Sequence, residues 1–176
     1  MNKAVIFLLF LPAALLTAGL FGAVHDQISY SVSSEYFTKF KFIQFGLQDP
    51  SVPERIRAAV VGFRASWWMG IPLGALCGVA GFIQRSPASM GRALTWSLPA
   101  MTAFTLAVAL AGLAYGWAQT QTINPGSYRG WFIPPGVKDL RAFLCAGYMH
   151  NFAYLGGALS IPAAWIFHLI FRVCAS

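Results

Sequence analysis

Four long stretches without Asp, Glu, Lys or Arg constrain this chain more than any other feature. They cover residues 4–24, 65–83, 93–118 and 142–171. The hydrocarbon core of a bilayer is about 30 Å thick, and a helix of roughly 20 apolar residues can cross it. Because peptide groups inside a bilayer have no water to bind, such stretches must be helical. The sequence therefore predicts an all-α membrane protein, a four-helix transmembrane bundle.

The composition agrees with this class. Charged residues make up 10% of the chain, against about 25% in an average soluble protein. We treat residues 1–176 as one transmembrane domain with spans at about 4–24, 63–84, 93–118 and 145–171. The first apolar run exceeds the roughly 7 to 15 residues of a signal-peptide core, so we expect it to be retained.

Two polar segments, residues 25–62 and 119–144, must lie on the same membrane face, because two spans separate them. Every carboxylate of the chain lies in these segments: Asp26, Glu35, Asp49, Glu54 and Asp139. The aromatic run at 30–45 is too apolar for a free loop, and we expect a short helix in the membrane interface. The alternation at 39–42 also fits a strand. The second segment carries Pro/Gly turn signals and predicts a loop that caps this face.

The distribution of basic residues bears on orientation. Eight of the twelve Lys and Arg residues lie on the capped face, which the positive-inside rule would place in the cytoplasm. The signal-like start of the chain argues the opposite. We expect both termini to be cytoplasmic, because the acids and aromatics of the capped face indicate a folded cap rather than topogenic charge.

Small residues recur at intervals of four in three of the predicted spans. The rows are Ala14, Ala18 and Gly22; Gly70, Gly74 and Gly78; and Gly112 and Gly116. Such rows let helix backbones approach closely. We expect them to pack the four helices of one chain together, with a homodimer face as the alternative.

Two helix-end pairs, His25–Asp26 and His150–Asn151, are the candidates for chemistry. Histidines from facing helices at similar depth can hold a metal ion or a haem, and a neighbouring acid or amide can orient such a ligand. His25 and His150 are therefore the candidate metal ligands. The alternative is that each is an interfacial residue bound to backbone or head groups. The candidate polar site comprises His25, Asp26, Tyr30, Glu35, His150 and Asn151.

Three arginines form a candidate anion or head-group site. Arg57 and Arg64 are seven residues apart and share a helix face, and Arg141 precedes the last span. Snorkelling to the lipid phosphates is the alternative for Arg64. The net charge of +7 does not indicate nucleic acid, because no basic soluble domain exists to bind it; anionic lipid is the expected counterpart.

Several enzyme classes lack their signatures here. Cys77, Cys145 and Cys174 are isolated, which argues against thiol–disulfide chemistry with its paired cysteines. We find no nucleophile elbow and no phosphate loop. No span centre carries an acid or a base of the kind that proton-coupled transporters use.

Three sequence islands resemble bacterial four-helix integral membrane proteins of no assigned function. They are His25-Asp26-Gln27-Ile28-Ser29-Tyr30, the run from Glu35 to Phe42, and Met149-His150-Asn151 with Tyr154. The resemblance implies a bacterial inner-membrane location and brings no activity with it.

Two functions remain open from the sequence. We expect a non-catalytic accessory or binding subunit whose cap contacts a partner protein or lipid head groups. Membrane lipids, a membrane protein complex or a second copy of the chain are the expected partners. The alternative is a redox or metal-dependent enzyme with a metal, haem or quinone site near His25 and His150.

Overall fold

A computed structural model describes residues 2–174, and no strand occurs in this range. Four helical segments in it are long and apolar enough to cross a membrane: Lys3–Val32 (α1), Glu54–Ile83, Pro87–Gln119 (α6) and Leu140–Cys174 (α7). The second segment is continuous and alternates between α-helix and short 3₁₀ helix. It consists of α4 (Glu54–Ser66), η2 (Trp67–Met69), α5 (Gly70–Val79) and η3 (Ala80–Ile83). The predicted all-helical fold with four such helices is confirmed.

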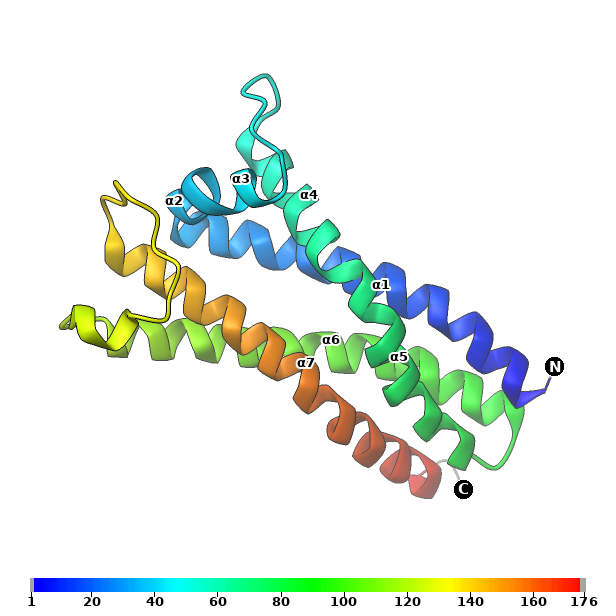
Figure 1. Ribbon diagram of the computed structural model, residues 1–176. Helices are drawn as coiled ribbons and strands as arrows, with labels where there is room; N and C mark the ends of the chain where they lie inside the picture. The colour runs from blue at the N-terminus through cyan, green and yellow to red at the C-terminus, as the bar shows by residue number, and fades with distance from the viewer. Residues whose placement is uncertain (1, 175–176) are drawn as a thin grey trace.

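The four segments form two pairs (Figure 1). One pair consists of α1 packed along α4 and α5, and the other consists of α6 packed along α7. Both termini lie at one end of the molecule, and the two long polar segments lie at the other. At the end with the termini, the Lys3 ammonium donates hydrogen bonds to the carbonyls of Phe82, at 3.0 Å, and Gln84.

The long helices extend beyond the apolar stretches and into the two cap segments. Helix α1 continues beyond residue 24 to Val32, α4 begins at Glu54 and α7 begins at Leu140. Ser33 ends α1 with an extended backbone, and its hydroxyl accepts a hydrogen bond from the N–H of Tyr36. This capping bond starts the next helix in a new direction. His25 and Asp26 therefore lie within α1 rather than at its end.

The aromatic segment is helical, as expected, and its alternating run does not form a strand. It comprises α2 (Ser34–Tyr36), a turn of π-helix (η1, Phe37–Lys41) and α3 (Phe42–Gln44). Phe37 and Phe42 are fully buried in a core with Val61 of α4 and Phe143 of α7. The cap thus has an apolar core of its own, which fixes it on the ends of the helices. Its position in a membrane interface stays a prediction.

The second cap segment is a loop that contains the short 3₁₀ helix η4 (Pro125–Tyr128). Trp131 packs on Tyr148 of α7, with 4.9 Å between ring centroids. Phe132 packs on Phe40 of the aromatic segment, at 5.1 Å. These contacts join the two cap segments to each other and to the last helix.

The small-residue rows pack inside the chain, which confirms that prediction. A Cβ atom added at Gly22 of α1 would lie 2.1 Å from the carbonyl oxygen of Gly62 on α4. One added at Gly70 would lie 2.6 Å from the carbonyl of Ala14, and one at Gly112 would lie 2.2 Å from Cβ of Phe152. Both helix pairs therefore depend on close approaches that only small residues allow.

We predict that Gly22→Ala destabilises the protein whereas Gly91→Ala does not. Alanine in a helix normally gains about 1 kcal/mol over glycine, but at position 22 the methyl group would collide with backbone, and overpacking costs about 1–3 kcal/mol. Position 91, also in a helix, is open, and its nearest atom, on Ile6, is 4.0 Å away. Unfolding by SDS in mixed micelles, followed by circular dichroism, measures both variants. Equal midpoints would contradict the role of the Gly22–Gly62 contact.

Candidate functional site

His25 and Asp26 of α1 meet His150 of α7 in a buried cluster. The two imidazole rings contact edge to face, with 4.7 Å between centroids. Oδ1 of Asp26 lies 3.0 Å from Nδ1 of His25 and 3.7 Å from Nε2 of His150. His25 and Asp26 are each only 3% exposed. The two histidines, predicted to lie at similar depth, thus share one carboxylate oxygen.

Neighbouring residues hold the His150 ring in place. The hydroxyl of Ser29 lies 3.2 Å from Nε2 of His150, and the Tyr36 ring stacks on the imidazole at 4.9 Å. Sequence reasoning missed both residues. Ser29 has a recognisable signal, since it follows His25 by four residues and so lies on the same helix face. The stacking of Tyr36 has no local signal, because it depends on how the cap folds back.

Two polar atoms of the cluster lack partners among the described residues. Nε2 of His25 and Oδ2 of Asp26 are both buried without a hydrogen bond. Buried polar atoms in proteins are nearly always paired, and each unpaired one costs about 1–3 kcal/mol. The cluster therefore has unused capacity to bind a ligand or a proton.

The donor set fits a divalent transition metal. One ligand atom from each of His25, Asp26 and His150 lies within 4.8 Å of the other two. Two ligands about 2.1 Å from a tetrahedral ion are about 3.4 Å apart, a value between the two distances measured from Asp26 Oδ1. Imidazole and carboxylate ligands suit zinc and other first-row ions. Three protein ligands leave one position open, as in catalytic sites.

The same geometry does not suit a shared haem. Two axial histidines bind on opposite faces of the iron, with the macrocycle between them. Here the His25 and His150 rings touch each other, so a porphyrin has no space between them. Of the metal groups considered from the sequence, a single ion fits these residues best.

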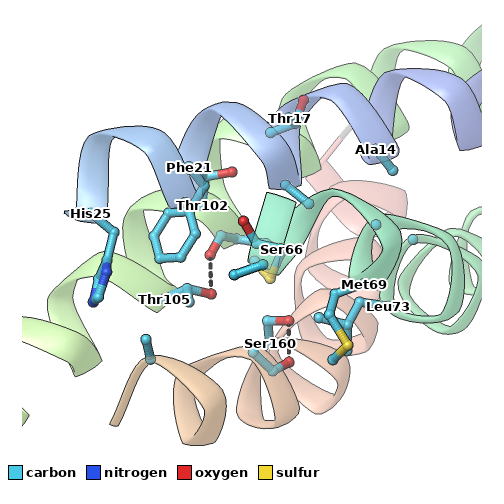
Figure 2. Close-up of a pocket in the computed structure, with 18 of the residues that line it drawn as sticks. Ala14, Thr17, Phe21, His25, Ser66, Met69, Leu73, Thr102, Thr105 and Ser160 are labelled. Carbon is cyan, nitrogen blue, oxygen red and sulfur yellow. Dashed lines mark hydrogen bonds between the residues drawn. The ribbon is translucent and has the colours of Figure 1, made fainter. Parts of the chain in front are cut away.

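The cluster forms one end of a cavity of about 180 Å³ between the two helix pairs. Figure 2 shows His25 at one end of this cavity and Ala14 toward the other, with Thr102 and Thr105 on the wall that α6 forms. Lys41 and Tyr154 also line the cavity. The Lys41 ammonium lies over the Phe40 ring, 4.6 Å from its centroid, and burial lowers the pKa of this lysine.

Three members of the predicted polar site lie outside the cluster. Tyr30 donates a hydrogen bond to the Glu54 carboxylate. Glu35 pairs with Lys39 at 2.7 Å. Asn151 is exposed on α7, and Ser29 takes the place expected for it beside His150.

The three arginines do not form one anion site in this structure. Arg57 is buried, with its guanidinium 4.4 Å from the centroid of the Phe42 ring and a hydrogen bond to the carbonyl of Leu47. Arg141 packs on the Trp117 ring and donates to the Trp117 carbonyl at 3.2 Å. Arg64 is exposed on α4. Two of the three therefore serve contacts within the chain.

Comparison of the chain with protein families, curated proteins and solved structures found no match. The resemblance drawn from the sequence islands stays a prediction.

We predict that Glu35 holds the 120–139 loop in place until strongly acidic pH. Its carboxylate accepts hydrogen bonds from the N–H groups of Asp139, at 2.8 Å, and Lys138. The Asp139 N–H, the Lys39 side chain and the Lys138 N–H lower the pKa of Glu35 from 4.5 to about 2. Because the folded pKa is the lower one, this stabilisation is present above pH 4.5 and is lost as the pH falls toward 2.

Hydrogen-exchange protection factors of the Lys138 and Asp139 amides measure this loss. Glu35→Gln keeps one acceptor oxygen but loses the charge, so it is expected to weaken the protection at neutral pH. Asp49→Asn is the control. The Asp49 carboxylate binds the nearby Ser51 amide and not the amides of Lys138 and Asp139. Protection in Glu35→Gln that matches the unmodified protein would refute the prediction.

Proposed function

We propose that this chain is a multi-pass membrane protein that binds a divalent transition metal ion at His25, Asp26 and His150. Membrane insertion is supported by the outward faces of the long helices, which carry many exposed large apolar side chains, among them Leu8, Leu9, Leu20 and Ile166. Exposed apolar surface on this scale marks a protein or membrane contact. A bacterial inner membrane is the proposed location, on the basis of the resemblance of the sequence islands.

One observation carries the metal proposal. Two imidazoles and one carboxylate, from helices far apart in sequence, converge within 4.8 Å. Two of their buried polar atoms lack partners in the part of the chain that the structure describes. Ser29 and Tyr36 fix the orientation of His150 as outer groups commonly fix metal-bound histidines. A bound ion would act as a Lewis acid toward an oxygen atom in its open position. That position would face the cavity.

The non-catalytic accessory subunit remains the second candidate. Its cap would bind a partner protein or lipid head groups. The contacts of the cap favour the buried cluster instead, since Glu35 and Arg57 already bind groups of the same chain. Arg64 is the exposed cation of the predicted set, and a role at the lipid head groups suits it.

We predict that the purified, chelator-treated protein binds one Zn²⁺ per chain. His25→Ala, Asp26→Asn and His150→Ala should each weaken binding by at least about 100-fold, because loss of a ligand costs at least as much as loss of an outer partner. His168→Ala is the matched control. His168 is a fully buried histidine that lies near Gln84, far from the cluster. Isothermal titration calorimetry in detergent gives the affinity and stoichiometry.

Equal Zn²⁺ binding by the unmodified protein and all three cluster variants would contradict the metal site. A metal-free protein that co-purifies in fixed ratio with one partner would instead support the accessory subunit. Circular dichroism of each variant checks that the helices remain intact.

We predict, separately, that both termini are cytoplasmic. Ser127→Cys adds a cysteine in the cap, and Ala88→Cys adds one at the opposite end. Each is made in a chain whose exposed Cys174 is replaced by serine and whose other cysteines, Cys77 and Cys145, are buried. A membrane-impermeant maleimide applied to intact cells should label position 127 and leave position 88 unlabelled. The reverse pattern would invert the topology.

A further inference from the structure

The cavity below the cluster is long and reaches far into the bundle. On α1 it extends from His25 to Phe10, about 22 Å at 1.5 Å per residue. Helices α1, α4, α5, α6 and α7 all contribute to its wall. One lipid chain spans about half of a hydrocarbon core that is about 30 Å thick, so the cavity is long enough for such a chain.

Several hydroxyl groups on its wall already bind backbone carbonyls. Thr102 donates to the carbonyl of Leu98 and Thr105 to that of Met101, both at 2.8 Å. Ser160 donates to the carbonyl of Gly157 at 2.6 Å. These residues present little unsatisfied polarity to the cavity, so its wall suits an apolar occupant.

The cavity reaches the surface beside α1. Tyr154, which lines it, is 60% exposed, and Phe21 and Thr102 are partly exposed. On the outer face of α1, next to Phe21, Leu20 and Val24 are exposed apolar side chains. An apolar molecule in a membrane could therefore enter from the side.

The polar end of the cavity favours an anionic head group. A divalent ion bound by the single carboxylate of Asp26 would leave net positive charge, and Lys41 lines the same cavity. An oxygen of the head group would take the open position on the ion. The charge at the polar end and the length of the apolar cavity thus both suit a molecule with an anionic head and one hydrocarbon chain.

We propose that the cavity holds the hydrocarbon chain of a single-chain anionic amphiphile, such as a fatty acid, with its head at the His25–Asp26–His150 cluster. The head contact rests on the proposed metal function, whereas the chain contact does not.

Photolabelling tests the proposal. Purified protein in detergent is irradiated with a palmitic acid analogue that carries a diazirine near the end of its chain, and labelled peptides are mapped by mass spectrometry. Labels are expected within residues 10–25 and 97–105, and excess palmitate should remove them. Labels spread over outward residues such as Leu8 and Leu9, without competition, would overturn the proposal.

Two variants on α6 supply the matched comparison. Thr102→Phe places a ring in the cavity and should reduce labelling at least tenfold. Thr95→Phe makes the same change on an exposed face of the same helix, where the Thr95 hydroxyl makes the same type of bond to its own backbone, at 3.0 Å. Labelling there should match the unmodified protein. Equal labelling of the two variants would overturn the proposal.

A further comparison distinguishes binding of the hydrocarbon chain from binding of the metal ion. His25→Ala should lose Zn²⁺ yet keep photolabelling in the cavity, whereas Thr102→Phe should keep Zn²⁺ and lose the label. Failure of the metal function therefore shows in the Zn²⁺ titration, and failure of the cavity proposal shows in the photolabelling.

Discussion

The contact between Gly22 and Gly62 determines where the other parts of the molecule lie. It brings the backbones of α1 and α4 so close that a methyl group at either position would collide with the other helix. The contacts of Gly112 and Gly116 with Phe152 and Tyr148 hold α6 and α7 together in a similar way. The cavity between the pairs is lined in part by the same small residues, among them Ala14, Gly22 and Gly62.

The same contact sets the depth of the cluster. His25 and Asp26 follow Gly22 by about one turn of α1, so they leave the close helix crossing and face α7, where His150 meets them. A carboxylate buried alone would cost several kcal/mol. Asp26 reduces that cost through His25 at 3.0 Å, but its second oxygen has no hydrogen-bond partner within residues 2–174. A cation bound by the cluster would offset the charge of this carboxylate.

Local patterns were enough to predict the helices and much of their packing. The length of the stretches without charged residues predicted the four helical segments. The small-residue rows that contain Gly22, Gly70 and Gly112 predicted the close helix contacts. The extent of α1 was not predictable, since residues 25–32 are polar and become helical core through partners such as His150. Arg57 and Arg64 do share a face, as their spacing predicts, yet the 45–53 loop folds over Arg57 alone. Successive helical residues point about 100° apart, so an inward His150 leaves Asn151 outward.

The cap closes the cluster on one side only. Tyr36 stacks on His150 and is 7% exposed, and Phe37 behind it is fully buried, so an aromatic layer separates the imidazoles from the capped end of the molecule. On the other side the cluster opens into a cavity walled mainly by apolar groups. Water is thus kept from the end where a polar molecule would approach, while the open side faces hydrocarbon in the proposed membrane. A ligand of the proposed site would therefore have to reach it through the membrane.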